Sequence, residues 1–90
     1  MSPSSPWHIR YHRNVKKEIR RLPNSVIRRV FVLMESLEKN PRPAGSEKLQ
    51  DYDLWRLRVG NYRIIYHIDD EQRTVTIYRI RHRRDVYRGL

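Results

Sequence analysis

The period of hydrophobic and polar positions changes along the first half of the chain. Residues 7–11 alternate between apolar or aromatic and polar side chains, which predicts a half-buried β-strand. Apolar residues then recur at intervals of four and three over residues 15–22, as on one face of a helix. Residues 23–25, Pro-Asn-Ser, interrupt this helix, and a second helix is predicted from about Val26 to Lys39. Its broad apolar stripe, typical of the main helix of a core, consists of Val26, Ile27, Val30, Phe31, Leu33, Met34 and Leu37.

The second half of the chain alternates in the manner of β-strands, after a loop at Asn40–Ser46. The predicted strands are Leu54–Val59, Tyr62–Ile68 and Thr74 to about Arg81, and residues 47–53 have no clear period. Gly60 and Asn61 predict a tight hairpin turn between the first two of these strands. Helices must cover the apolar face of a sheet to bury it. We therefore expect an α+β fold with an N-terminal strand, a helical hairpin and a three-stranded antiparallel meander, with the helices packed on one face of one sheet.

Strand alternation also predicts where a group of cationic side chains lies. Arg56 and Arg58 share one face of their strand, because successive side chains point to opposite faces. Their neighbours on the other face are apolar and are expected to lie under the helices. Arg63 follows the hairpin turn and joins the same open face if the register is regular. The tail then adds Arg81, Arg83 and Tyr87, so the sequence predicts a basic surface on the side of the sheet away from the helices.

Composition narrows the classes of partner. The 90 residues carry 20 Lys and Arg against 10 Asp and Glu, a formal net charge of +10, and this balance is typical of proteins that bind nucleic acid. The length suits one domain, predicted at residues 7–90 after a flexible lead-in at residues 1–6. The chain has no cysteine, which excludes disulfides and thiolate chemistry. No apolar run approaches the ~20 residues of a membrane span, and the N-terminus lacks the apolar region of a signal peptide.

Two phrases carry a resemblance to a known family. Residues 57–66 read Leu-Arg-Val-Gly-Asn-Tyr-Arg-Ile-Ile-Tyr, and residues 82–88 read His-Arg-Arg-Asp-Val-Tyr-Arg. With the predicted order of elements, the chain resembles the RelE/ParE superfamily of toxin–antitoxin toxins over nearly its whole length. The RelE branch consists of small ribonucleases that cut mRNA in the ribosomal A site, and the ParE branch shares the fold but poisons gyrase. The resemblance implies a RelE-like fold and a metal-independent endoribonuclease toxin that inhibits translation in the cytoplasm.

The resemblance also implies roles for individual residues. The RelE pattern has two cations before the hairpin turn, commonly lysines, and this chain has Arg56 and Arg58 there. An arginine after the turn, an arginine near the last strand's end and a late tyrosine correspond to Arg63, Arg83 and Tyr87. The predicted catalytic residues are Arg63, Arg83, Tyr87 and His82, and the predicted RNA-binding residues are Arg56, Arg58, Arg81, Arg84 and Arg88.

The identity of a general base stays open at this point. Arginine holds its proton too firmly to accept one from a ribose hydroxyl. The remaining candidates are Tyr87 and His82, and Tyr87 has the further option of stacking on a nucleotide base. Arg63 is expected to donate to the phosphate oxygens as negative charge grows on them, because a guanidinium fork matches phosphate and stays charged.

The resemblance implies a specific set of partners. These are a cognate antitoxin, the ribosome and its mRNA, and promoter DNA only through the antitoxin complex, with no membrane, cofactor or metal. Two other functions remain compatible with the residues. One is a ParE-like gyrase inhibitor without nuclease activity, and the other is a catalytically inactive basic RNA-binding module.

Overall fold

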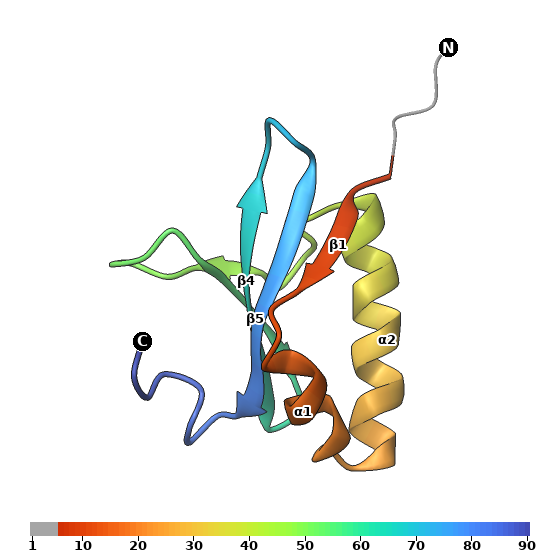
Figure 1. Ribbon diagram of the computed structural model, residues 1–90, viewed down its shortest axis with the longest axis vertical. Coiled ribbons are helices and arrows are strands. Elements are labelled where there is room, and N and C mark those ends of the chain that lie inside the picture. The colour runs from red at the N-terminus through yellow and green to blue at the C-terminus, as the bar shows by residue number, and fades with distance from the viewer. Residues whose placement is uncertain (1–5) are drawn as a thin grey trace.

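The computed structural model describes residues 6–90, so residues 1–5 of the predicted lead-in lie outside the described part of the chain. The elements follow in the order of a strand, two helices and four strands (Figure 1). The helices are α1 (Val15–Arg20) and α2 (Asn24–Lys39), and the strands are β1 (His8–Tyr11), β2 (Glu47–Lys48), β3 (Trp55–Val59), β4 (Tyr62–Asp69) and β5 (Thr74–His82). The strands form one sheet in the order β1-β5-β4-β3-β2. The predicted α+β architecture is confirmed.

The sheet is built around the predicted meander. β3, β4 and β5 pair antiparallel in chain order, whereas β1 lies parallel to β5 at one edge. β2 pairs antiparallel with β3 at the other edge, and it was not predicted, because two residues are too few to establish a period. Gly60 and Asn61 connect β3 to β4 as expected, and Gly60 has a φ of +58°. This left-handed conformation favours glycine, which has no Cβ to clash with the backbone.

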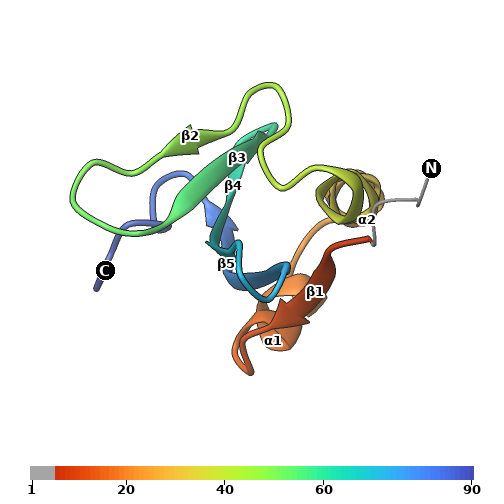
Figure 2. The ribbon, with the colours of Figure 1, turned by 90° about the horizontal axis from the view of Figure 1, so that it is seen from above.

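One face of the sheet packs against α2, and the C-terminal tail lies on the other side (Figures 1 and 2). The alternation in β3 and β4 matches the prediction, because the side chains facing the helices are buried. The buried cluster comprises Val15, Leu22, Val30, Met34, Leu37, Leu57, Val59, Ile64, Tyr66, Ile68, Val75, Ile77 and Ile80. Trp55 and Tyr62 are half-buried and pack against its margin. The strands and helices therefore share one core, and the opposite face of the sheet is left to the tail.

Two residues depart from the predicted pattern of burial. Phe31 belongs to the apolar stripe of α2 by spacing, yet its side chain is 52% exposed. Alternation along β4 predicts that Ile65 shares the polar face with Arg63 and His67, yet Ile65 is fully buried and lies outside the main cluster. Its cross-strand partner is Arg79, whose guanidinium donates to the carbonyl of Val86, itself fully buried. The tail thus folds back toward Arg79, the strand partner of Ile65, and the open face has buried apolar side chains of its own.

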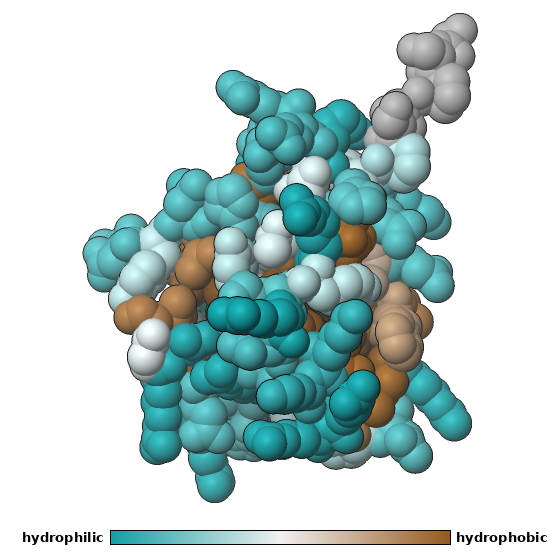
Figure 3. Space-filling view, viewed as in Figure 1, coloured by the Kyte–Doolittle hydropathy of each residue, from teal (hydrophilic) through white to brown (hydrophobic). Residues whose placement is uncertain are grey.

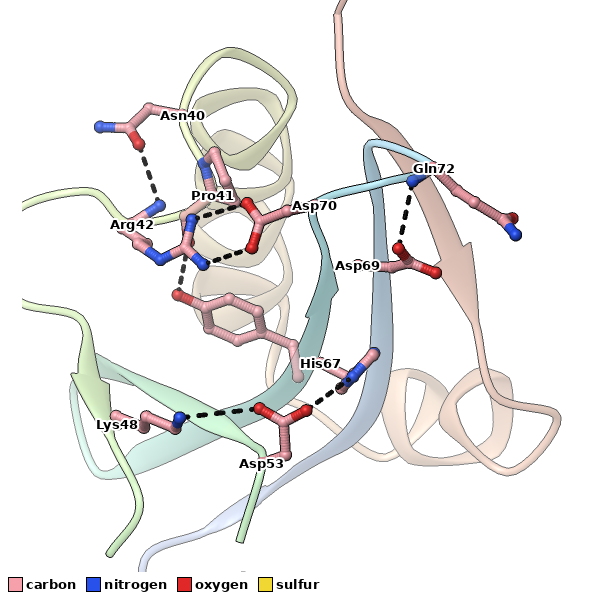
Figure 4. A network of polar contacts seen from close by, with 10 residues as sticks. Asn40, Pro41, Arg42, Lys48, Asp53, His67, Asp69, Asp70 and Gln72 are labelled. Carbon is pink, nitrogen blue, oxygen red and sulfur yellow. Dashed lines mark hydrogen bonds and ion pairs between the residues drawn. The ribbon is translucent and has the colours of Figure 1, made fainter.

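Polar contacts tie the loop before β2 to the turn between β4 and β5 (Figure 4). Arg42 donates through both terminal nitrogens to the Asp70 carboxylate, at 3.2 and 2.9 Å. This hydrogen bond, followed by the charge of Arg42, holds the pKa of Asp70 below its ordinary value. Tyr66 donates its hydroxyl to the carbonyl of Pro41 at 2.8 Å, and burial raises the pKa of Tyr66 to about 12. The loop is fixed at its start, and it delivers Glu47 to the sheet edge beside Arg56.

Within residues 6–90, neither helix combines the length and apolarity that crossing a membrane requires.

Candidate active site

The predicted basic surface gathers on the face of the sheet away from α2. Arg56 and Arg58 alternate with the buried Leu57 and Val59 along β3, and Arg58 pairs directly with Arg63 across the hairpin. The end of β3, the start of β4 and the approach to β2 enclose a hollow of about 340 Å³. Its lining consists of Gly45, Glu47, Arg56, Arg58 and Arg63. The hairpin register therefore brings together the cations that alternation predicted on one face.

Tyr87, on the C-terminal tail, is in contact with Arg56, one of the residues that line this hollow. Arg56 donates from Nη1 to the Tyr87 hydroxyl oxygen at 2.8 Å. The other edge of the same guanidinium donates from Nε to Glu47 Oε2 at 3.1 Å, and Nη2 donates to that oxygen as well. The hydrogen bond to Tyr87, followed by the one to Glu47, raises the pKa of Arg56. Arg56 is therefore a charged donor held between a phenol and a carboxylate.

Arg63 is the arginine that lies against the hairpin turn. Its Nη1 donates to the carbonyls of Gly60 and Tyr62, at 3.0 and 2.9 Å, which fixes the guanidinium against the hairpin turn. Burial lowers the pKa of Arg63 first, and the charges of Arg58, Arg83 and Arg56 lower it further. The charge interaction with Tyr87 raises the pKa of Arg63 and so partly offsets these effects. An arginine keeps its proton even so, and these mutual repulsions mean that the group has a strong attraction for a bound anion.

Arg83 joins the group because the tail leaves β5 beside the hairpin turn. Its backbone amide donates to the carbonyl of Asn61 at 2.8 Å. Its side chain is exposed, and its charge acts on Arg63. We use the term arginine cluster for Arg56, Arg58, Arg63 and Arg83. The structure brings this cluster and Tyr87 together from β3, β4 and the tail.

His82 is not brought to the arginine cluster. It pairs with Tyr62 across β4 and β5, so the two side chains share the face of the sheet that packs on the helices. Their rings meet edge to face with centroids 5.4 Å apart. The backbone amide of Arg84 donates to His82 Nδ1 at 3.2 Å. Counting the register from Tyr62 would have predicted this side, since directly paired residues point the same way.

The remaining predicted cations also lie apart from the cluster. Arg81 is the cross-strand partner of Arg63, but its Nε donates to Glu18 of α1 at 2.5 Å. Arg88 lies 3.6 Å from Asp85 and is 80% exposed, and Arg84 is exposed. Arg81 is thus part of a contact between α1 and β5, whereas Arg84 and Arg88 are available on the surface of the tail.

Glu47 is the site residue that the sequence pattern did not reveal. It lies on the short strand β2, opposite Arg56 in the register. Binding to Arg56, by hydrogen bonds first and by charge second, lowers the pKa of Glu47 below its ordinary value. The only sequence signal was an acidic residue shortly before a strand with alternating arginines. Among residues 6–90, no three acidic or histidine side chains gather in a way that could hold a metal ion.

Comparison with known proteins agrees with this architecture. Residues 9–87 match the family model described as the ParE toxin of the type II toxin–antitoxin system parDE. Toxin RelG of Mycobacterium tuberculosis is 31% identical over 85 residues, which cover 92% of this chain and 98% of RelG. Toxin RelE of the same organism is 31% identical over 90 residues, covering 98% of this chain and 93% of that toxin.

A solved structure extends the likeness to three dimensions. The archaeal RelE of the RelE–RelB complex from Pyrococcus horikoshii superposes with a TM-score of 0.80 at 28% identity, over 90% of this chain and 99% of that one. Similarity therefore spans essentially the full length of both the relatives and this protein. The chain belongs to the ParE toxin family of type II toxin–antitoxin systems and, within the RelE/ParE superfamily, to its RelE-like branch.

Proposed function

We propose that this toxin is a ribosome-dependent endoribonuclease, which cleaves mRNA in the A site and so inhibits translation in the cytoplasm. The observation that carries the proposal is a single hollow lined by Arg56, Arg58 and Arg63, with the Tyr87 hydroxyl bound to Arg56. Guanidinium groups donate to phosphate in a planar fork, and they stay charged at every physiological pH. An RNA backbone is the polyanion that such a hollow suits best.

The cleavage would use the ribose 2′-hydroxyl as nucleophile. That hydroxyl loses its proton to a base and attacks the adjacent phosphorus, the bond to the 5′-oxygen breaks, and the leaving oxygen takes up a proton. Arg63 is the preferred donor to the phosphate oxygens, because the hairpin carbonyls already hold it in place. A preorganised donor of this kind contributes roughly 3–4 kcal/mol to transition-state stabilisation. Arg56 and Arg58 would orient the backbone, and Arg83 would add electrostatic attraction.

Tyr87 is the better candidate base of the two. Its hydroxyl oxygen is 2.8 Å from Arg56 Nη1, whereas His82 packs on Tyr62 at the helix side of the sheet. Stacking of the Tyr87 ring on a nucleotide base is compatible with the same position and would contribute roughly 1–3 kcal/mol. The ribosome supplies much of the remaining alignment of the mRNA, and positioning alone accounts for a large part of many rate enhancements.

Primer extension on programmed ribosomes tests this proposal. We expect the purified toxin to produce cuts within the A-site codon, and we expect Arg63→Ala to lower the single-turnover rate about 10²- to 10³-fold. Tyr87→Phe should lower it by roughly 10²-fold, as expected for loss of a proton-transfer group. Arg20→Ala removes one exposed positive charge from α1 and serves as the control. A wild-type toxin that binds ribosomes but leaves the mRNA intact would contradict the proposal.

A gyrase inhibitor is the second candidate, because the matching family model is named for ParE. A supercoiling assay with purified gyrase separates the two functions. Inhibition of supercoiling together with intact mRNA on ribosomes would favour the ParE-like activity, and the reverse result would favour the nuclease.

We further propose that a cognate antitoxin binds this toxin, as RelB accompanies RelE in the archaeal complex. The expected partner segment is acidic and amphipathic, because the toxin offers both positive charge and exposed apolar side chains. Hydrophobic side chains reach the surface along α2 (Figure 3), and the exposed Arg28 and Arg29 lie on that helix beside the exposed Val32. Contact with promoter DNA is expected through the antitoxin in the assembled complex.

A further inference from the structure

Tyr87 lies on a segment without regular secondary structure. After β5 ends at His82, residues 83–90 form neither helix nor strand, and the Tyr87 side chain is 42% exposed. The segment turns back on itself through amide donations from Val86 to His82 and from Arg88 to Asp85, both at 3.1 Å. These local turns give the tail a shape, but they do not hold it against the sheet. Another contact must set the distance between Tyr87 and Arg56.

Arg79 of β5 supplies that contact. Its Nη1 donates to the carbonyl of Val86 at 2.9 Å and to the carbonyl of Arg88 at 2.6 Å. These carbonyls belong to the residues on either side of Tyr87 in the sequence. One guanidinium nitrogen therefore grips the backbone on both sides of Tyr87, whose hydroxyl is then free to meet Arg56.

A β-bulge explains why Arg79 faces the tail. Ile65 pairs with Arg79, but the next residue of β4, Tyr66, pairs with Ile77, so Tyr78 is the extra residue. Without that extra residue, Arg79 would follow Val75 and Ile77 onto the core side by simple alternation. The bulge shifts the phase by one, which returns Ile80 to the core and presents Arg79 to the opposite face.

The chemistry of Arg79 indicates that this residue positions the tail around Tyr87, and does not mainly stabilise the fold. Burial lowers the pKa of Arg79, and the charge of Arg81 lowers it further, while Glu18 partly offsets both. A half-buried guanidinium whose hydrogen bonds go to carbonyls carries a desolvation cost. A neutral apolar side chain could have covered Ile65 without that cost. Unlike an apolar side chain, Arg79 donates hydrogen bonds, and they go to the carbonyls of the two residues that flank Tyr87.

We propose that Arg79 is a positioning residue for Tyr87, which clamps the tail so that the phenol reaches the arginine cluster. The expected effect of Arg79 on the cleavage rate rests on the proposed nuclease function. Three further contacts hold the tail beside Arg79. They are the buried side chain of Val86, the Arg83 amide, which donates to the carbonyl of Asn61 at 2.8 Å, and the Tyr52 hydroxyl, which donates to the carbonyl of Leu90 at 3.0 Å. None of them touches the residues on both sides of Tyr87.

A double-mutant cycle on programmed ribosomes tests the proposal. We expect Arg79→Gln to lower the single-turnover rate by about the same factor as Tyr87→Phe, roughly 10²-fold. The double variant should be no slower than either single one, because each removes the same group from the site. Toxin affinity for the ribosome should stay within about twofold, and Arg79→Lys should recover part of the rate, since it keeps the charge and a donor. Arg20→Gln on α1 is the matched control. Additive losses, or a wild-type rate in Arg79→Gln, would overturn the proposal.

Amide hydrogen exchange followed by NMR gives a readout that does not depend on cleavage. In Arg79→Gln, the amides of Val86 and Arg88 should exchange at least tenfold faster, while the amides of β4 keep their protection. Unchanged tail exchange would contradict the clamp. If Arg79→Gln loses protection in β4 as well, Arg79→Lys replaces it in the comparison. Because lysine keeps a donor, its tail amides should then exchange faster than in wild type, by a smaller factor than in Arg79→Gln, while β4 keeps its protection. A wild-type toxin that cuts no mRNA refutes the proposed function, whereas the exchange result still decides whether Arg79 holds the tail.

Discussion

Glu47 occupies the edge of the Arg56 guanidinium that a phosphate would otherwise take. Its Oε2 accepts from Nε and Nη2 of Arg56, the pair of donors that matches two phosphate oxygens. The Glu47 side chain is 62% exposed, so the pair breaks at small cost when a stronger anion arrives. At the scale of residues, the hollow therefore holds an internal carboxylate, which would compete with an RNA backbone under the proposed function.

Replacing Glu47 by Gln should strengthen RNA binding. The change frees the Arg56 fork and adds one net positive charge to the hollow, so a short RNA should bind roughly three- to fivefold more tightly at low salt. Fluorescence anisotropy with a labelled oligonucleotide measures the change. Glu35→Gln makes the same charge change at an exposed position on α2 and serves as the control. Equal tightening in both variants would show that net charge, and not the Arg56 fork, is responsible.

The same variant makes a prediction about pH. Arg56 holds the pKa of Glu47 below its ordinary value of 4.5, so the carboxylate stays ionised in the native protein above that pH. The stabilising contribution of the pair is therefore fully present above pH 4.5 and is lost as the pH falls through the lowered native pKa. The affinity difference between wild type and Glu47→Gln should follow the same course and disappear only on the acid side of 4.5.

At the scale of elements, the turn between β3 and β4 sets the spacing of the arginine cluster. Gly60 has a left-handed φ of +58°, and a Cβ at this position would lie 3.2 Å from Arg29 Nη1. Arg63 also donates to the Gly60 carbonyl, so the turn conformation and the Arg63 guanidinium are linked. Strain in this turn would displace the cation that the proposed chemistry needs most.

Gly60→Ala should lower the free energy of unfolding by about 1–2 kcal/mol, because an L-residue pays for the left-handed conformation. Urea denaturation monitored by the tryptophans measures the loss. Gly60→Asn keeps a Cβ but tolerates the left-handed region better, so its loss should be smaller. Equal losses in both variants would assign the cost to the contact with Arg29 and not to φ.

At the scale of the whole molecule, positive charge lies both on the face of the sheet away from the helices and beside the exposed apolar side chains of α2. The arginine cluster faces away from the helices, whereas α2 exposes Phe31 and Val32, the latter at 63%. Val32 also lines a hollow of about 310 Å³ between α2 and β3, together with Leu33, Val59 and three arginines. An acidic amphipathic segment can satisfy both parts of this surface at once.

Val32→Asp should weaken antitoxin binding without affecting cleavage. The substitution puts a negative charge where an apolar contact is expected, and we predict at least a tenfold rise in the dissociation constant, about 1.4 kcal/mol. Calorimetry with the cognate antitoxin measures the dissociation constant, and ribosome cleavage by the free variant serves as the control. An unchanged dissociation constant would mean that the antitoxin reaches the basic face by another route.

The local pattern was sufficient for most of the architecture. Period and breakers predicted both helices, the turn at Gly60 and the strands of the meander, because each depends on neighbours within a few residues. Alternation alone put Arg56 and Arg58 on the face away from the helices. The short β2 was missed, because two residues establish no period and its pairing comes from β3.

The site itself depended on contacts between distant parts of the chain. The sequence by itself determined that Arg56 and Arg58 would share the face of their strand away from the helices, since alternation and turn chemistry depend on neighbouring residues. Only the tertiary structure decided which other cations and which late side chains join them, because register and ion pairs connect residues far apart in the chain. The bulge at Tyr78 turned Arg79 toward the tail, the pairing with Tyr62 took His82 to the helix side, and Glu18 drew Arg81 away. Sequence spacing does not encode these long-range choices, which follow from the packing of the tail and of α1 against the finished sheet.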